Sequence, residues 1–252
     1  MPRFLGLTTA LAVREWQSRY RRSVLGPCWA VIPPFFYIIA FTFLRTMMGV
    51  QTSGREYALF AACALVPWTF FGAAVQRMGQ SVISNAAILR KCPLQHEAFL
   101  VAALAISCID FAITLAVLVA GLCVVGIWVD VTICWLAFPM VLMLALSMGI
   151  GFFMAGLGSY RRDILMAFNF ILQFWLLATP ILYKLGDVPE RWRGLYALNP
   201  MVGIIEAFRS ILLTHTMPDF WLLAQGLPVT CALIAVGWPL FRYMGRYFAD
   251  VL

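Results

Sequence analysis

Six apolar runs, each about 20 residues long or longer, constrain this chain more than any other feature of its sequence. An α-helix rises about 1.5 Å per residue, so a run of this length matches the roughly 30 Å hydrocarbon core of a membrane. The chain is therefore predicted to be an all-α, polytopic membrane protein with six transmembrane helices. The predicted crossings are approximately Gly26–Met48, Tyr57–Gly79, Phe99–Trp128, Thr132–Leu157, Ile164–Tyr183 and Leu222–Tyr243.

Lys and Arg residues fall mainly on one side of these crossings. That side holds both termini and the segments Arg77–Glu97 and Arg161–Asp163; it carries 12 basic and four acidic residues, against six and six on the other side. Loops rich in Lys and Arg stay in the cytoplasm, so both termini are expected to be cytoplasmic. Topology and anionic lipid account for the net charge of +7, so no nucleic-acid partner is expected.

The N-terminal segment is MPRFLGLTTALAVREWQSRYRR. Its apolar stretch is too short to cross a membrane, and it has no signal-peptide cleavage pattern. On a helix, Arg14, Gln17 and Arg21 share one face. An apolar face comprises Leu5, Ala12, Trp16 and Tyr20. This pattern predicts an amphipathic helix in the headgroup plane, although an ordinary basic flank also fits it.

Motifs for nucleotide, ester or peptide hydrolysis are absent, since the sequence has no GxxxxGK[ST], GxSxG or HExxH. His96 and His215 lie far apart and the cysteines have no CxxC spacing, so no metal site is expected. The chain is expected not to be an enzyme and to take its energy from an ion gradient or a partner. The acid inside the third run, Asp110, is either a functional group or a helix–helix hydrogen-bond partner of a Ser, Thr or Asn.

Four stretches resemble the permease subunits of type-2 ABC exporters, in the branch that exports lipid-linked O-antigen, capsule and teichoic-acid polysaccharides. They are RYRRSVLGPCWAVIPP (19–34), RKCPLQHEAF (90–99), YRRDI (160–164) and TPILYKLGDVPERWRGLYALNPMVGIIEAFRSILL (179–213). Their order and spacing extend the resemblance over nearly the whole chain. It implies a single permease domain, 1–252, divided into an interfacial helix and loop (1–25), five crossings (26–183), an external gate region (184–221) and the last crossing with its tail (222–252).

The resemblance also implies the function and the partners. The chain is expected in the cytoplasmic (inner) membrane, paired with a second copy and with two ATPase subunits that bind ATP and Mg, while it holds no cofactor itself. The expected cargo is a polysaccharide linked to undecaprenyl pyrophosphate, foremost the O-antigen of lipopolysaccharide. A type-2 permease for a drug or lipid is the main alternative, and a membrane enzyme acting on the carrier lipid is a further one.

Two basic segments on the cytoplasmic side have expected roles. The family's coupling helix, which docks on the ATPase, corresponds here to Asn85, Ile88, Leu89, Arg90, Lys91 and Pro93, and a simple basic turn is the alternative. Guanidinium groups beside a helix start suit a lipid-linked pyrophosphate. Its predicted site is Arg19, Arg21, Arg22, Leu25 and Gly26, and positive-inside anchoring explains the same arginines.

Aromatic residues recur every seven positions in the first and fifth runs, which line the conduit in the family. A sugar ring can stack on such side chains without one fixed hydrogen-bond pattern, whereas packing or lipid contact also explains them. The predicted conduit residues are Trp29, Phe36, Tyr37, Phe43, Phe168 and Trp175.

A further helix is predicted over Met201–Leu213, after the fifth crossing, because Asn199 can cap it and Pro200 suits its first turn. Glu206 and Arg209 lie three residues apart and are expected to pair on its polar face. In the family this region forms re-entrant gate helices at the external mouth, and a plain external loop is the alternative.

Overall fold

The computed structural model describes residues 2–21, 23–47, 54–89, 95–128 and 130–248, and every regular element in these ranges is helical. The α-helices are α1 (Pro2–Tyr20), α2 (Ile32–Met47), α3 (Gly54–Ser84), α4 (Ala86–Leu89), α5 (Glu97–Val124), α6 (Ala137–Tyr160), α7 (Arg162–Ala178), α8 (Glu190–Ala197), α9 (Pro200–Leu213) and α10 (Phe220–Gly245). Short 3-10 helices are η1 (Gly26–Ala30), η2 (Val131–Leu136) and η3 (Leu185–Asp187).

Four helical segments in the described ranges are long and apolar enough to cross a membrane: α3, α5, η2 with α6, and α10. The helices α8 and α9 meet at 98° and would together count as a fifth. The first and fifth predicted crossings are shorter than expected, because part of the first forms η1 and the extended backbone of Thr179 before Pro180 ends α7. The helices α2 and α7 have 16 and 17 residues, so six crossings stay a prediction.

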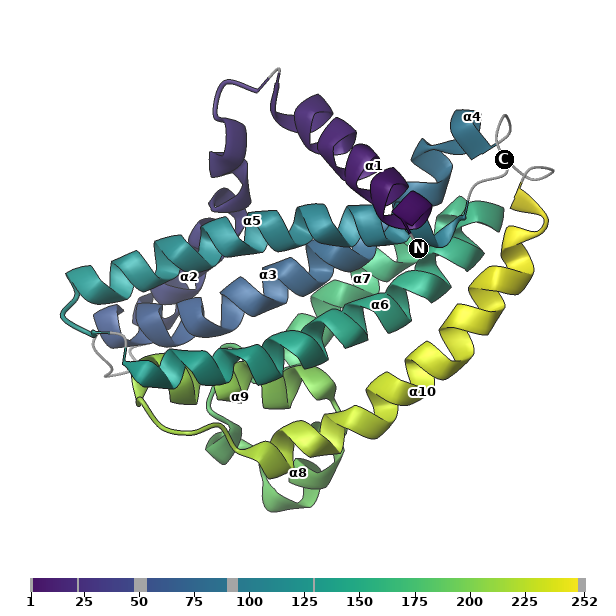
Figure 1. Cartoon of the computed structure of the whole chain (residues 1–252). Coiled ribbons are helices and arrows are strands. Elements are labelled where there is room, and N and C mark those ends of the chain that lie inside the picture. The colour runs from purple at the N-terminus through teal and green to yellow at the C-terminus, as the bar shows by residue number, and fades with distance from the viewer. Residues whose placement is uncertain (1, 22, 48–53, 90–94, 129, 249–252) are drawn as a thin grey trace.

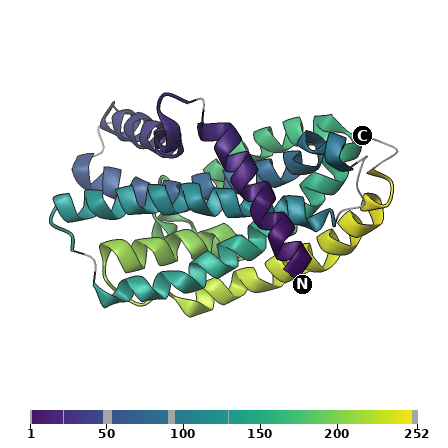
Figure 2. The same ribbon diagram turned by 45° about the horizontal axis from the view of Figure 1, so that its top comes forward.

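The long helices α3, α5 and α6 run side by side along the bundle, with α10 packed on α6 (Figure 1). The start of α1, the short helix α4 and the end of α10 lie at one end of the bundle, whereas α8 and α9 lie toward the other half. The helix α1 is not part of the bundle and crosses α5 obliquely (Figure 2). Its residues Thr8 and Leu11 are buried against the bundle, while Leu5 and Trp16 are exposed.

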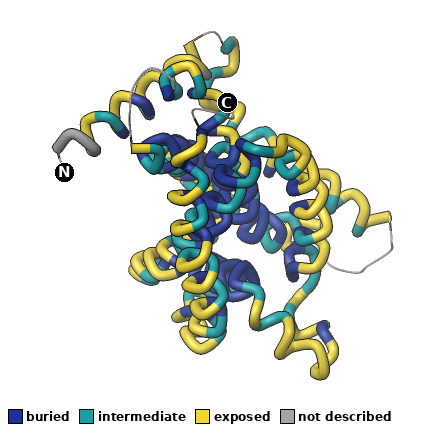
Figure 3. Tube along the Cα trace, turned by 90° about the vertical axis from the view of Figure 1, so that its right-hand side faces the viewer, coloured by how far each residue is buried: buried dark blue, intermediate teal, exposed yellow. Residues whose placement is uncertain are grey.

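Buried residues gather in the middle of the bundle, whereas the outer helices carry many exposed residues (Figure 3). The main core includes α9 with Phe208, and a second core at the α1 end includes Leu11, Phe99 and Phe241. The close approach of α6 and α10 depends on glycine, because a Cβ at Gly237 would lie 2.9 Å from the carbonyl oxygen of Gly149. Small residues allow this packing between membrane helices, where no hydrophobic effect drives association.

Candidate functional site

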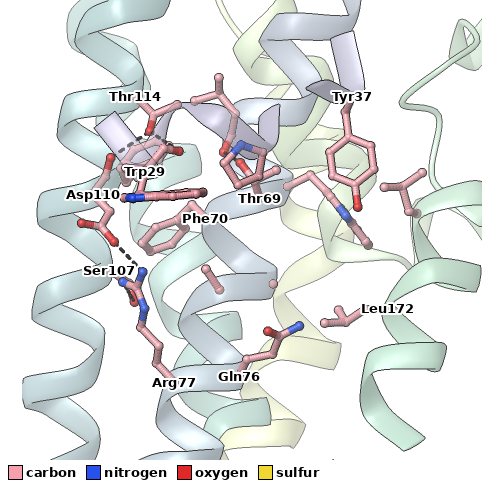
Figure 4. A pocket seen from close by; sticks show the side chains of 18 of the residues that line it. Trp29, Tyr37, Thr69, Phe70, Gln76, Arg77, Ser107, Asp110, Thr114 and Leu172 are labelled. Carbon is pink, nitrogen blue, oxygen red and sulfur yellow. Dashed lines mark hydrogen bonds and ion pairs between the residues drawn. The ribbon is translucent and has the colours of Figure 1, made fainter. Parts of the chain in front are cut away.

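A cavity of about 530 Å³ is bordered by the helices η1, α2, α3, α5 and α7 (Figure 4). Its volume falls within the range of about 300–1,000 Å³ that is typical of small-molecule sites. The lining combines aromatic side chains, side-chain amides and one ion pair. We take this cavity as the candidate functional site because it is the place where the described residues bring polar groups from three predicted crossings together.

The ion pair joins Arg77 of α3 to Asp110 of α5, with Nη2 and Oδ2 2.5 Å apart. Arg77 Nη1 also donates to the Ser107 hydroxyl at 3.1 Å. The two charged side chains are only 16% and 10% exposed. Asp110 thus pairs with an arginine that the sequence analysis did not consider as its partner, because Arg77 lies within α3 instead of in a cytoplasmic loop. A charge of either sign survives at this depth because the other neutralises it.

The aromatic wall of the cavity comes from η1 and α2, and includes Trp29 and Tyr37. Gly26 starts η1 with a φ of +49°, a conformation that favours glycine, and Pro27 follows in the first turn. The Thr114 hydroxyl of α5 donates to the carbonyl of Ala30 at 3.3 Å, which fixes η1 to α5. Trp29 is thereby held beside Phe70 and at the level of Asp110 (Figure 4).

Side-chain amides also line the cavity. Gln76 of α3, and Asn169 and Gln173 of α7, line it and are exposed. Sequence reasoning missed all three, because it searched the runs for ionisable and aromatic groups. The available signal was the spacing of four residues between Asn169 and Gln173, which places two amides on one face of a helix that is apolar after its first two residues.

The predicted conduit residues divide into three groups. Trp29 and Tyr37 line the cavity, whereas Phe36 and Phe43 of α2 are exposed and do not line it. Phe168 of α7 is buried in the main core. Trp175 packs edge-on against Trp68 and Phe71 of α3. The structure thus does not place the six aromatics on one continuous surface within this chain, and their conduit role stays a prediction.

The predicted pyrophosphate site lies around the link between α1 and η1, and none of its residues lines the cavity. Arg19 is in the last turn of α1, Arg21 and Leu25 are exposed, and Arg22 lies outside the described residues. The N–H of Gly26 donates to the Ser23 hydroxyl at 3.1 Å. Arg21 is exposed in the link between α1 and η1, and the pyrophosphate role of these residues stays a prediction.

The predicted coupling segment begins on the described chain and continues beyond it. Asn85 is buried, and Ile88 and Leu89 belong to α4, which packs on the second core. Arg14 of α1 donates to the side-chain oxygen of Asn85. The other predicted coupling residues, Arg90, Lys91 and Pro93, lie outside the described residues. The contact links the helix outside the bundle directly to this segment.

The predicted helix Met201–Leu213 is confirmed as α9, while its role in a gate stays a prediction. The Asn199 side chain accepts from Met201 N at 3.1 Å, with Pro200 at the first position. Glu206 and Arg209 pair at 2.7 Å, as predicted. The predicted polar face was wrong, because Arg209 is only 4% exposed. Its guanidinium donates to the carbonyl oxygens of Pro180 and Ile181, 2.6 and 2.7 Å away. Arg209 thus satisfies the irregular backbone that follows α7.

A second cavity, of about 610 Å³, lies between the start of α5 and the end of α10. Arg242 and Glu97 pair there at 3.5 Å, and Arg242 also lies over the ring of Trp238. Burial lowers the pKa of His96, and the negative charge of Glu97 opposes that shift. Across the described chain, no three His, Cys, Asp or Glu residues are grouped as metal ligands.

Comparison with known proteins places this architecture among transporters. A family model described as "ABC-2 type transporter" matches residues 6–213, from α1 to the end of α9. The "O-antigen export system permease protein RfbA" of Myxococcus xanthus is 25% identical over 251 residues, 98% of this chain and 95% of the relative. A protein of the same name from Klebsiella pneumoniae is 23% identical over 249 residues, again 98% and 95% of the two chains. The "Polysialic acid transport protein KpsM" of Escherichia coli is 19% identical over 240 residues, 92% and 91% of the two chains.

Proposed function

The chain belongs to the ABC-2 type transporter family, and we propose that it is the membrane-spanning subunit of an ATP-driven exporter of undecaprenyl-pyrophosphate-linked polysaccharide. The observation that carries this proposal is the similarity to O-antigen export permeases over 98% of the chain. We infer the O-antigen of lipopolysaccharide as the cargo class. Transport by such a subunit needs no covalent chemistry in this chain, so ATP and Mg act in the partner.

The proposed topology has six crossings in the inner membrane with both termini in the cytoplasm. The excess of Lys and Arg on one side supports it, as does the placement of the start of α1 and the end of α10 at the same end of the bundle. We assign α1 to the headgroup plane because it lies outside the bundle with Leu5 and Trp16 exposed. We assign α8 and α9 as re-entrant gate helices because of their 98° bend and the buried backbone beside Arg209.

The proposed assembly pairs two copies of this chain with two ATPase subunits. The exposed aromatic side chains of α2 and α7, such as Phe36, Phe43 and Phe174, offer an apolar surface for the second copy or for lipid. The segment around Asn85 is the proposed docking point for the ATPase, and its contact with Arg14 would pass a displacement to α1. ATP-driven closure of the partners then moves α1 and opens a lateral entrance for the lipid carrier.

The experiment uses a strain that makes lipid-linked O-antigen but lacks its own permease. We expect the chain together with its ATPase partner to restore surface O-antigen, measured by gel electrophoresis of lipopolysaccharide. A partner variant that binds but does not hydrolyse ATP is the control, and it should leave lipid-linked O-antigen inside the cell. Export without any ATPase, or chemical conversion of the lipid-linked glycan by the chain alone, would refute the proposal. ATPase stimulation by drugs or phospholipids but not by lipid-linked glycan would favour a drug or lipid permease.

A further inference from the structure

The second cavity, between the start of α5 and the end of α10, presents two arginines whose side chains can accept a further partner. Arg242 approaches Glu97 through Nε, at 3.5 Å, and its two terminal nitrogens have no hydrogen-bond acceptor among the described residues. Arg246 lies one turn further along, is exposed, and has no acidic partner in the same part of the chain. In contrast, Arg77 and Arg209 bond carboxylates at 2.5 and 2.7 Å. The second cavity therefore offers guanidinium groups that can form charge-assisted hydrogen bonds with an anion.

The charged groups that line this cavity leave one net positive charge. Arg242 and Arg246 are cationic, whereas Glu97 is anionic. Burial lowers the pKa of His96, and the charge of Glu97 opposes that shift, so the imidazole is neutral at pH 7. The positive end of the α5 dipole and the negative end of the α10 dipole meet here, so the side chains decide the balance. A phosphodiester with a single negative charge matches this balance, whereas a pyrophosphate carries more charge than the cavity neutralises.

Aromatic side chains accompany these arginines on the outer face of α10. Trp238 and Tyr243 line the cavity and are exposed, and the Arg242 guanidinium lies 5.2 Å from the centre of the Trp238 ring. Trp238, Arg242 and Arg246 are four residues apart and follow one helix face over about 12 Å, with the ring nearer the middle of the helix. An aromatic ring followed by cations toward the helix end is typical of a helix that passes from acyl chains to headgroups.

The cavity lies at the end of the bundle that is proposed to face the cytoplasm. The start of α1 and the end of α10 lie at that end (Figure 1). Anionic phospholipids of the cytoplasmic leaflet bind basic pockets between transmembrane helices. Gln95 and Tyr243 add a side-chain amide and a phenol hydroxyl to the lining, and these groups can bond the ester and glycerol oxygens of a headgroup.

We propose that this cavity binds the headgroup of one anionic phospholipid of the cytoplasmic leaflet, with the phosphodiester on Arg242 and Arg246 and the acyl chains along α10 beside Trp238. Phosphatidylglycerol has the required chemistry, because its phosphodiester carries one negative charge and its headgroup carries hydroxyls. Glu97 competes with the phosphate for Arg242 and thereby limits the affinity. The site goes beyond the proposed export function: it requires the proposed orientation in the membrane but does not depend on the cargo.

The binding test uses the chain with its ATPase partner, purified in an uncharged detergent. The probes are phosphatidylglycerol, phosphatidylcholine and undecaprenyl pyrophosphate, and bound lipid is counted by native mass spectrometry. We expect phosphatidylglycerol to bind about fivefold more tightly than phosphatidylcholine, the effect of one charge near the membrane surface. The double variant Arg242→Gln/Arg246→Gln should weaken this binding about 25-fold, and Glu97→Gln should strengthen it about fivefold.

The matched control is Arg161→Gln/Arg162→Gln, which removes two exposed arginines on the same proposed side of the membrane. Neither of them lines the cavity. This control should change phosphatidylglycerol binding by less than about twofold, because its charges lie outside the site. Each double variant keeps ten of the 12 basic residues on that side, so the orientation of the chain should not change.

Several results would contradict the phospholipid site. Equal binding of phosphatidylglycerol and phosphatidylcholine, an equal loss in the two double variants, or weaker binding by Glu97→Gln would each overturn it. Tighter binding of undecaprenyl pyrophosphate than of phosphatidylglycerol would also overturn it and would assign the cavity to the carrier lipid. Inorganic phosphate at the same concentration should not displace phosphatidylglycerol, and displacement would show a site for a free anion instead of a lipid.

Discussion

Arg209, which is buried, and Arg77, which is half-buried, have the same partner chemistry but different surroundings. Arg209 bonds Glu206 at 2.7 Å and Arg77 bonds Asp110 at 2.5 Å, and both guanidinium groups are shielded from solvent. Arg209 further donates to two backbone carbonyls after α7 and lies 3.5 Å from the centre of the Phe60 ring. Arg77 instead lines a cavity and bonds one hydroxyl, that of Ser107.

The difference separates a structural arginine from one beside a site. Arg209 supplies hydrogen bonds to backbone that has left the helix and cannot reach water, which is the condition for irregular backbone inside a membrane protein. Arg77 leaves no backbone dependent on it, so its pair with Asp110 sets the polarity of a wall. Substitutions in the Arg209–Glu206 and Arg77–Asp110 pairs should therefore lower the free energy of unfolding by different amounts.

The largest effect is expected for Arg209→Leu, which removes the partners of Glu206 and of the Pro180 and Ile181 carbonyls together. We expect a loss of about 5 kcal/mol in the free energy of unfolding, at the upper end for breaking a buried ion pair. The measurement is the temperature at which the purified protein leaves the monodisperse peak in size-exclusion chromatography. Arg209→Lys keeps the positive charge but lacks the planar guanidinium group, so we expect it to lose only part of this stability. A leucine variant as stable as the unmodified chain would show that Arg209 is not needed for the fold.

The next effect is expected for Asp110→Leu, which leaves the half-buried Arg77 guanidinium without its carboxylate. The expected cost is about 3 kcal/mol. Adding Arg77→Leu should restore most of this stability, because two apolar side chains replace the pair and no backbone depends on it. The same heating assay measures both variants. If the double variant were less stable than Asp110→Leu alone, Arg77 would stabilise the fold without its partner, as Arg209 is expected to do. The two arginines would then not differ in role.

A smaller effect is expected for Asn199→Ala at the start of α9. This change removes the cap on Met201 N and the 3.0 Å hydrogen bond from Asn199 to the Thr179 hydroxyl. The expected cost is about 1–2 kcal/mol, since an N-cap contributes about 1 kcal/mol. Asn199→Asp is the control: it keeps the cap and loses only the donor to Thr179. If both variants lost the same stability, the cap would contribute nothing.

The smallest effect is expected for Arg242→Gln, which breaks the pair with Glu97 at the end of α10. Arg242 is 62% exposed and its pair spans 3.5 Å, so water and salt screen it. We expect a cost of no more than about 0.5 kcal/mol, reduced further at high ionic strength. A loss as large as that of Asp110→Leu would show that this end of the bundle is as dry as its centre.

The helix α9 shows how far local reasoning reaches. The cap at Asn199, the first-turn Pro200 and the pairing of Glu206 with Arg209 were all predictable, because each depends on residues within four positions of one another. The burial of Arg209 was not, because its carbonyl partners lie 28 and 29 residues away. The spacing of Asn169 and Gln173 was a local signal for two amides on one face of α7, but that this face borders a cavity with Gln76 depends on which helices meet.

The sequence alone determined the helical class, the approximate places of the long helices and the asymmetry of charge, because length, apolar composition and local capping are properties of single segments. The tertiary structure decided that Arg77 pairs with Asp110, that Trp29 and Gln173 border one cavity and that Arg209 lies inside. These facts depend on how helices distant in sequence pack against one another. An apolar helix has no single dominant face that would specify its neighbours, so only the folded bundle determines them.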